Sequence, residues 1–338
     1  MNSRLTAIVA SLVACLLVLL WYQSGTDESK PPAALIPVRI ADSNTSPAGL
    51  LLQVALQQGH FEAEGLLPTI VGRDSYGGAH LNALLQGKLD VATASEVPIM
   101  RAGLSGKDIR VIATIGKGTG RHVSVVARKD RGIATLADLS GKRVGVSFGS
   151  NAEYYLDSLL TSRGLEASIV SKVHTKPGDI KKKLVAGDVD AIAAWFPGWK
   201  HAEEAIGDNA VTFNGDGIYT VFFNALVTPD FIGRRPEAIN QLMRVFISAE
   251  KYADAHPQEV KALFAKFFRL NETTTEEVFN NYSLRTTLGQ DLLVALESEA
   301  QWSIEKGLTK QKEMPNYLNF IHIESLDKVA PHAVSIIH

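Results

Sequence analysis

The sequence predicts an α/β protein with two similar lobes, each a mostly parallel sheet flanked by helices, and a cleft between the lobes. Two observations lead to this prediction. Short apolar strands alternate with amphipathic helices from Ile36 onward, and the same order of elements occurs twice. The segment ALLQGKLDVA at 83–92 also matches KLVAGDVDAI at 183–192, with glycine and aspartate in register. Two consecutive βαβαβ units explain both observations, since each unit forms a sheet covered by helices.

The individual elements of both units follow from this pattern. In each repeated segment a glycine is placed to end a helix in the left-handed conformation, and an aspartate stands at the start of the next strand. The first unit is expected to have strands at 37–41, 67–72 and 89–93 and helices at 49–59 and 78–86. The second unit is expected to have strands at 143–146, 168–173 and 190–194 and helices at 152–163 and 179–186.

The C-terminal third of the chain has a different character. Helical segments are expected at 237–255, 257–268, 274–282 and 289–306. A helical tail of this kind packs most economically on the first lobe. The first lobe then comprises residues 36–124 and 222–338, and residues 125–221 form the second lobe. The chain crosses between the lobes near 122–128 and 219–224, and two such crossovers form a hinge.

The composition indicates a globular protein and excludes several classes. A chain of 338 residues is too long for one compact core and suggests about two domains. Its 34 Lys and Arg residues and 36 Asp and Glu residues leave a net charge of −2, which argues against nucleic acid as a partner. A hydrophobic content of 46% excludes a mainly disordered chain. The single cysteine, Cys15, excludes an internal disulfide and a cysteine-built metal site. We expect no metal and no cofactor.

The N-terminal residues 1–23 are expected to be a signal peptide or a membrane anchor. Residues 7–21 are apolar, which is long for a signal-peptide core and short for a spanning helix of about 20 residues, so cleavage and retention both stay open. The segment LVAC resembles a bacterial lipobox in which Cys15 is acylated, but the apolar residues after it favour an ordinary membrane-buried cysteine. Residues 24–35 form the expected tether. The folded body is therefore expected in the periplasm or on the outer face of the cytoplasmic membrane.

Catalytic motifs are not found in the sequence. It contains no Gly-x-Ser-x-Gly elbow, no Walker loop, no His-Glu-x-x-His helix and no paired cysteine spacing. We therefore expect no catalytic residues and no enzyme activity.

Small polar residues follow the predicted strands at their carboxyl ends, where open α/β sheets bind ligands. They precede helices, whose free amides can hold an anionic group. The repeat places residues 95–96 opposite 195–196, so that aromatic rings can form a wall and Glu96 can accept from a hydroxyl or an amine. His122 and Asp216 border the cleft at the crossovers. The candidate ligand-binding residues are Ser43, Asn44, Thr45, Gly77, Gly78, Ser95, Glu96, His122, Ser147, Gly149, Ser150, Asn151, Tyr154, Trp195, Phe196 and Asp216.

An ordered series of short segments links the chain to a known family. These segments are GHFEAEGL at 59–66, LQGKLDVA at 85–92, VARKDRGI at 126–133 and LADLSGKRVGV at 136–146. The series resembles the periplasmic solute-binding proteins of ABC importers, in the nitrate/sulfonate/taurine-binding group with the type II periplasmic-binding-protein fold. The resemblance implies a small solute bound between the lobes and an ABC permease with its ATPase as partners. It also implies solute contacts at 43–45, 77–78, Ser95, 147–151 and Trp195.

Two departures from the family concern the solute. Many relatives have an acidic residue before the proline that follows the matching tryptophan, whereas this chain has Phe196 before Pro197. Glu96 adds a carboxylate beside Ser95, and a buried carboxylate repels an anion unless it is protonated or paired. A polar organic solute with an apolar or amine portion therefore fits at least as well as nitrate or a simple sulfonate.

Two alternative functions remain on the same fold. A membrane-anchored domain could sense the solute and relay its presence to a membrane partner. A pyrimidine-precursor-binding protein or synthase is the other alternative, but the eukaryotic thiamine-pyrimidine synthases that the chain resembles carry a cysteine-rich motif that is missing here.

Overall fold

The structure is a computed structural model that describes residues 34–41, 47–72 and 77–337. The chain divides into residues 1–35 and residues 36–338, and the fold described below is that of the second part. The predicted signal or anchor segment lies outside the described residues. None of the helices in the described ranges is long and apolar enough to cross a membrane.

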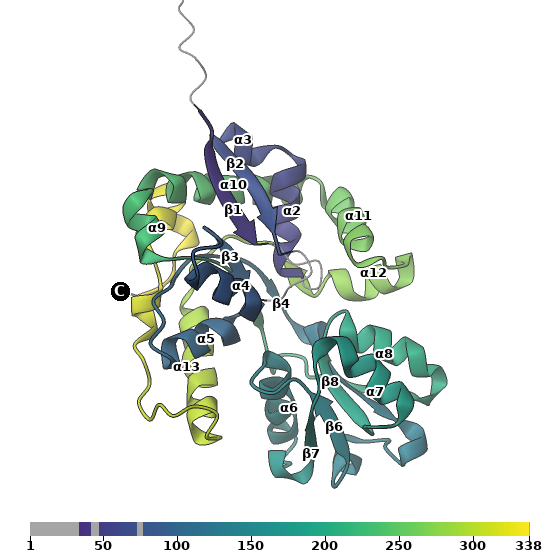
Figure 1. The fold of residues 1–338 in the computed structure, drawn as a ribbon. Coiled ribbons are helices and arrows are strands. Elements are labelled where there is room, and N and C mark those ends of the chain that lie inside the picture. The colour runs from purple at the N-terminus through teal and green to yellow at the C-terminus, as the bar shows by residue number, and fades with distance from the viewer. Residues whose placement is uncertain (1–33, 42–46, 73–76, 338) are drawn as a thin grey trace, which may run out of the picture. The chain divides into compact units, whose positions relative to one another are not determined.

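The strands of the described ranges form three sheets (Figure 1). The first sheet pairs β1 (Ile36–Ala41) with β2 (Leu66–Val71). The second has the order β11 (Tyr282–Ser283), β4 (Arg110–Gly118), β10 (Val221–Val227) and β3 (Ala92–Ala94). The third has the order β7 (Ser171–His174), β6 (Arg143–Val146), β8 (Ala191–Trp195), β5 (Val123–Arg128) and β9 (Ala210–Phe213).

The α/β class is confirmed, and the sheets are mixed. β1 pairs with β2, β6 with β7 and β6 with β8 in parallel, as two βαβ units require. β10 runs antiparallel to β3, β4 is antiparallel to β10 and β11, and β5 is antiparallel to β8 and β9. The reason is that β5 and β10 are each reached by a short segment that comes from a strand of the other sheet. Neither strand is reached through a crossover helix.

The helices follow the predicted pattern. Those of the first unit are α2 (Leu50–Gln57), α3 (His60–Ala63), α4 (Gly77–Leu85) and α5 (Glu96–Leu104). Those of the second unit are α6 (Asn151–Ser162), α7 (Ile180–Ala186) and α8 (Gly198–Ile206). Figure 1 shows α6 on one side of the five-stranded sheet and α7 with α8 on the other. Buried apolar side chains of these helices and strands form the core.

Four C-terminal helices lie close to the predicted ranges, and they are α10 (Pro236–Ala255), α11 (Pro257–Phe268), α12 (Glu272–Phe279) and α13 (Gln290–Glu305). Two short helices that were not predicted are α9 (Pro229–Arg234) and α14 (Glu324–Val329). α10 packs against α2 and α3, and α13 packs against α5. The tail therefore covers helices of the first unit, as expected for a chain that returns to its starting sheets.

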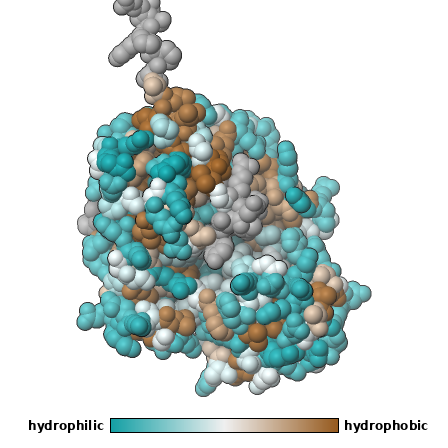
Figure 2. Space-filling model, viewed as in Figure 1, coloured by the Kyte–Doolittle hydropathy of each residue, from teal (hydrophilic) through white to brown (hydrophobic). Residues whose placement is uncertain are grey.

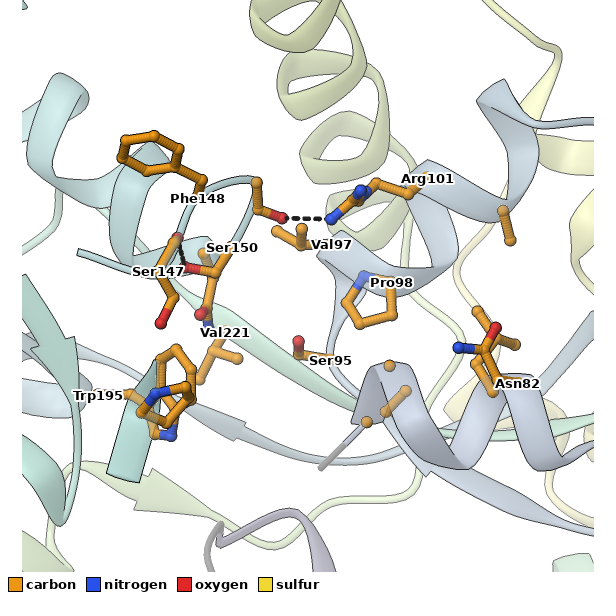
Figure 3. A pocket seen from close by; sticks show the side chains of 18 of the residues that line it. Asn82, Ser95, Val97, Pro98, Arg101, Ser147, Phe148, Ser150, Trp195 and Val221 are labelled. Atoms are coloured by element: carbon orange, nitrogen blue, oxygen red, sulfur yellow. Dashed lines mark hydrogen bonds between the residues drawn. The ribbon is translucent and has the colours of Figure 1, made fainter. Parts of the chain in front are cut away.

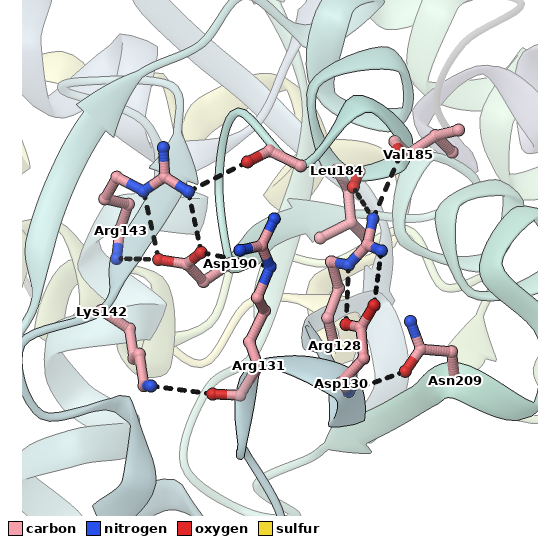
Figure 4. Close-up of polar contacts among 10 residues, drawn as sticks. Arg128, Asp130, Arg131, Lys142, Arg143, Leu184, Val185, Asp190 and Asn209 are labelled. Atoms are coloured by element: carbon pink, nitrogen blue, oxygen red, sulfur yellow. Dashed lines mark hydrogen bonds and ion pairs between the residues drawn. The ribbon is translucent and has the colours of Figure 1, made fainter.

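The two copies of the repeated segment are held by the same contacts. In the second copy the Arg143 guanidinium donates from Nη2 to Asp190 Oδ1 at 2.8 Å and to the Gly187 carbonyl oxygen at 2.9 Å (Figure 4). In the first copy Arg39 donates from Nη2 to Asp90 Oδ1 at 2.9 Å and from Nη1 to the carbonyl oxygen of the matching glycine. Each arginine thus ties the first strand of its unit to the end of a helix and to the aspartate that follows it.

The surface shown in Figure 2 is mostly hydrophilic, with hydrophobic residues gathered around β1 and β2. Leu35, Leu67 and Val71 are among the exposed large apolar side chains. Two short segments, 119–122 and 214–220, connect the strands of the second sheet with those of the third. They directly precede most of the two predicted crossover segments, 122–128 and 219–224, which fall largely in β5 and β10.

Candidate ligand-binding pocket

A pocket of about 650 Å³ lies among α4, α5, the loop before α6 and the ends of β8 and β10 (Figure 3). Elements of both the four-stranded and the five-stranded sheet therefore contribute to its walls. The predicted residues that line it are Gly77, Gly78, Ser95, His122, Ser147, Gly149, Ser150, Asn151 and Trp195. The predicted Ser43, Asn44 and Thr45 lie outside the described residues.

Two helices begin at the pocket with a serine at the N-cap position, but neither serine side chain caps its helix. Ser95 precedes α5 and Ser150 precedes α6, and neither side chain accepts a hydrogen bond from its helix. The Ser150 hydroxyl donates instead to the Ser147 carbonyl oxygen at 2.6 Å, and the Ser147 hydroxyl donates to the Thr175 carbonyl oxygen at 2.8 Å. The first-turn amides of α5 and α6 therefore receive no side-chain cap from these serines. These positive helix ends favour an anionic group in the pocket.

Cationic side chains on the pocket wall were not predicted. Arg101 extends from α5 and donates from Nη1 to the Gly149 carbonyl oxygen at 3.1 Å, across the pocket (Figure 3). Gly149 adopts φ 65°, a conformation that favours glycine and turns this carbonyl toward Arg101. Lys107 and Lys176 also line the pocket, whereas no Asp or Glu does so in the described part of the chain.

A signal for Arg101 was present in the sequence. The residues of α5 that line the pocket after Ser95 are Val97, Pro98, Arg101 and Ala102, which repeat at the spacing of one helix face. Extending the site along this face from Ser95 would have found the guanidinium.

Glu96 does not face the pocket, and its predicted role in the cleft wall is wrong. The side chain is fully buried, and it accepts hydrogen bonds from the Tyr219 hydroxyl and, at 2.8 Å, from the Phe222 backbone amide. Burial raises the pKa of Glu96 to about 7. The reason for the difference is that Glu96 is the first residue of α5, where consecutive side chains turn to different faces. Glu96 therefore makes no direct contact with a solute in the pocket.

Three further predicted residues lie outside the pocket lining. The Tyr154 ring packs edge-on against Trp302, with ring centroids 5.4 Å apart. Phe196 is fully buried among aromatic side chains. Asp216 is exposed in the turn before Gly217, whose φ is 74°. Core packing and turn formation, rather than a pocket, explain these three positions.

His122 lines the pocket as a neutral imidazole. It is 3% exposed, and its Nδ1 lies 3.2 Å from the Tyr282 hydroxyl oxygen. Burial lowers the pKa of His122 to about 3. His122 therefore adds no charge to the pocket near neutral pH. In the described ranges no three His, Cys, Asp or Glu side chains lie close enough together to hold a metal ion.

Comparisons with known proteins agree with this geometry. Residues 45–260 match the family described as NMT1/THI5 like. A protein of Brucella abortus named as a binding protein is 25% identical over 259 residues, which cover 74% of this chain and 77% of that protein. A protein of Bacillus subtilis named for binding aliphatic sulfonates is 24% identical over 263 residues, which cover 77% of this chain and 78% of that protein.

A solved structure shares the fold. The alkanesulfonate-binding protein of Xanthomonas axonopodis pv. citri, bound to MOPS, superposes with a TM-score of 0.72 at 21% identity, covering 86% of this chain and 99% of that chain. The two-lobed fold predicted by the resemblance is confirmed. The chain belongs to the NMT1/THI5-like family and has the periplasmic-binding-protein fold.

Proposed function

We propose that this protein binds a small organic anion of the sulfonate or taurine class and delivers it to an ABC importer. The observation that carries this proposal is that the helix starts at Ser95 and Ser150, neither of which has a side-chain cap, both line one pocket. Arg101 joins the two walls beside them. An anionic head group between these donors would receive hydrogen bonds from both sides of the pocket at once.

The remainder of the pocket suits an apolar body on the same solute. Leu81, Leu85, Val97, Trp195 and Phe223 line it, and about 650 Å³ is within the usual size of a small-molecule site. A sulfonate with an alkyl or aryl portion uses both parts of the pocket, whereas nitrate would leave the apolar part unfilled. The names of the Bacillus subtilis relative and the Xanthomonas structure support this solute class.

Closure over the solute is part of the proposal. The first lobe would comprise residues 36–124 and 222–338, and the second lobe residues 125–221. A solute that contacts both lobes only when they meet shifts the hinge equilibrium toward the closed form. The closed protein would then be recognised by a permease, with its ATPase, at the outer face of the cytoplasmic membrane. We propose no chemical change of the solute, which can be checked by recovering it intact after binding.

Thermal unfolding of the full chain with a solute panel tests the proposal. The panel contains unbranched alkanesulfonates, taurine, nitrate, amino acids, amines and pyrimidines. A solute that binds only the folded protein stabilises it by about 2.7 kcal/mol at a hundredfold excess over its Kd. We expect the alkanesulfonates to raise the Tm. An increase with amines or pyrimidines alone would overturn the proposed solute class.

A further inference from the structure

Two buried carboxyl groups lie behind the pocket, and one of them, Glu299, lacks the donors that a carboxylate needs. Glu96 begins α5 and is fully buried, and Glu299 lies in α13, which packs against α5, and is 1% exposed. Neither side-chain oxygen of Glu299 has a hydrogen-bond partner in the described structure. An ionised carboxylate without a donor is strongly disfavoured in the protein interior. A proton on Glu299 supplies the missing donor, and the neighbouring Glu96 can accept from it.

We propose that Glu96 and Glu299 form a proton-binding site that is coupled to the solute pocket, so that binding of an anionic solute takes up a proton. The sign of this exchange rests on the proposed function, because it requires the solute to be an anion. The existence of the proton site rests on the carboxyl pair alone.

The coupling follows from what surrounds Glu96. Its chain neighbours Ser95 and Val97 both line the pocket. Its Oε2 accepts from the backbone amide of Phe222, whose chain neighbours Val221 and Phe223 also line the pocket. Glu96 therefore lies directly behind two parts of the pocket wall, and a change of its charge alters the electrostatic potential there.

The same carboxyl group also holds a segment that connects the two sheets. Tyr219, in the segment 214–220, donates its hydroxyl to Glu96 Oε1. The Tyr219 ring packs against the rings of Tyr154 and Tyr155 on α6, with centroids 6.0 Å and 6.2 Å apart. The protonation state of Glu96 thus affects the segment 214–220, which would move if the lobes close.

Among the carboxyl pair and the three tyrosines that face it, the pair is the part that titrates near neutral pH. Burial raises the pKa of Glu96 to about 7, and burial together with the charge of Glu96 raises the pKa of Glu299 well above its usual range. Tyr154 of α6, Tyr219 of the connecting segment and Tyr317 beside α13 face the pair. Burial raises the pKa of each of these tyrosines, so all three are neutral at pH 7.

An anion in the pocket increases the proton affinity of a carboxyl group nearby, because it disfavours a second negative charge. By linkage, the bound solute and the bound proton then favour each other equally. We expect uptake of a fraction of one proton per bound solute near pH 7. The affinity for the anion should fall as the pH rises through the titration of the pair.

Calorimetry of the full chain with butanesulfonate tests this proposal. The sulfonate does not titrate near pH 7, so the number of protons exchanged follows from the binding enthalpies in two buffers with different ionisation enthalpies. We expect proton uptake in the wild type and none in Glu96→Gln/Glu299→Gln, which retains binding. Glu297→Gln is the matched control, since it removes an exposed carboxylate from the same helix.

The outcomes separate this proposal from the proposed function. Binding of butanesulfonate without proton exchange would overturn the coupling and leave the solute class intact. Uptake that persists in the double glutamine variant would also overturn it. If the double variant does not fold, Glu96→Gln alone replaces it, because the amide oxygen still accepts from Phe222 while its amino group donates to the Tyr219 oxygen.

If no alkanesulfonate binds, the proposed function fails and the proton site is judged in the free protein. The infrared carbonyl band of a protonated carboxyl group at pH 7, absent in Glu96→Gln/Glu299→Gln and present in Glu297→Gln, would support the site. A spectrum without that band in the wild type would overturn it.

Discussion

Trp195 and Phe196 are consecutive residues that lie in different environments. Trp195, at the end of β8, lines the pocket, whereas the Phe196 ring is fully buried with its centroid 5.3 Å from that of Phe268 and 5.9 Å from that of Phe264. Successive side chains of a strand point to opposite faces, and the alternation continues here past the last residue of β8. One of these aromatic residues is therefore available to the solute, while the other joins β8 to α11.

Alanine substitutions should separate the two roles. Phe196→Ala should lower the free energy of unfolding by about 3–5 kcal/mol, because it empties a packed aromatic site. Trp195→Ala should lower the affinity for an alkanesulfonate roughly tenfold, through a loss of about 1.4 kcal/mol of apolar contact. Urea unfolding and calorimetric titration measure the two effects. Trp195→Phe, which keeps an aromatic wall, should retain most of the affinity.

Arg101→Met should weaken anion binding while keeping the apolar stem of the side chain. The loss of a charge-assisted contact is worth about 1.5–3 kcal/mol, which corresponds to at least a tenfold increase in Kd. The difference should become smaller at high salt, because ions screen the guanidinium. Arg234→Met, on the exposed side of α9, changes the net charge equally and is expected to leave the Kd unchanged. Equal losses in both variants would show that only the net charge matters.

The Arg143–Asp190 contact should contribute to stability in a pH-dependent way. The hydrogen bonds from Arg143 lower the pKa of Asp190, so the unfolded chain binds the proton more strongly. This contribution is present at neutral pH and is lost as the pH falls through the lowered pKa. Asp190→Asn should cost about 2 kcal/mol at pH 7 and less in acid, as measured by denaturant unfolding. The same cost at both pH values would contradict this account.

The carboxyl pair should give the opposite pH dependence. Burial raises the pKa of Glu96 from its usual 4.5 to about 7, so the folded state binds the proton more strongly. Stability from this group is complete below pH 4.5 and falls as the pH rises through 7, by on the order of 3 kcal/mol. Glu96→Gln/Glu299→Gln should remove this decline between pH 5 and pH 8.

His122 gives a pH dependence of the opposite sign in a range that overlaps that of Glu96. Burial lowers the pKa of His122 to about 3, so its contribution to stability is complete above its usual value of 6.5 and is lost as the pH falls below that value. Glu297→Gln should show the same decline between pH 5 and pH 8 as the wild type. A decline that persists in the double glutamine variant would assign it to other groups.

Most of the fold could be predicted from the repeated segments of the sequence. A local rule governs the glycines that end helices in the left-handed conformation, with φ 68° at Gly87 and 76° at Gly187. The sequence also placed Ser150 just before a helix. Such features depend on a few neighbouring residues, so a single sequence contains them.

Only the tertiary structure decided which side chains face the pocket. Glu96 turns toward Tyr219, which is 123 residues away in the chain, and Arg101 reaches Gly149, 48 residues away. Phe196 packs on helix α11 of the C-terminal tail. These contacts join distant segments, and their geometry depends on how helices and sheets pack rather than on local spacing. The sequence by itself therefore determined the order of elements and the region of the site, while packing decided its charge and its walls.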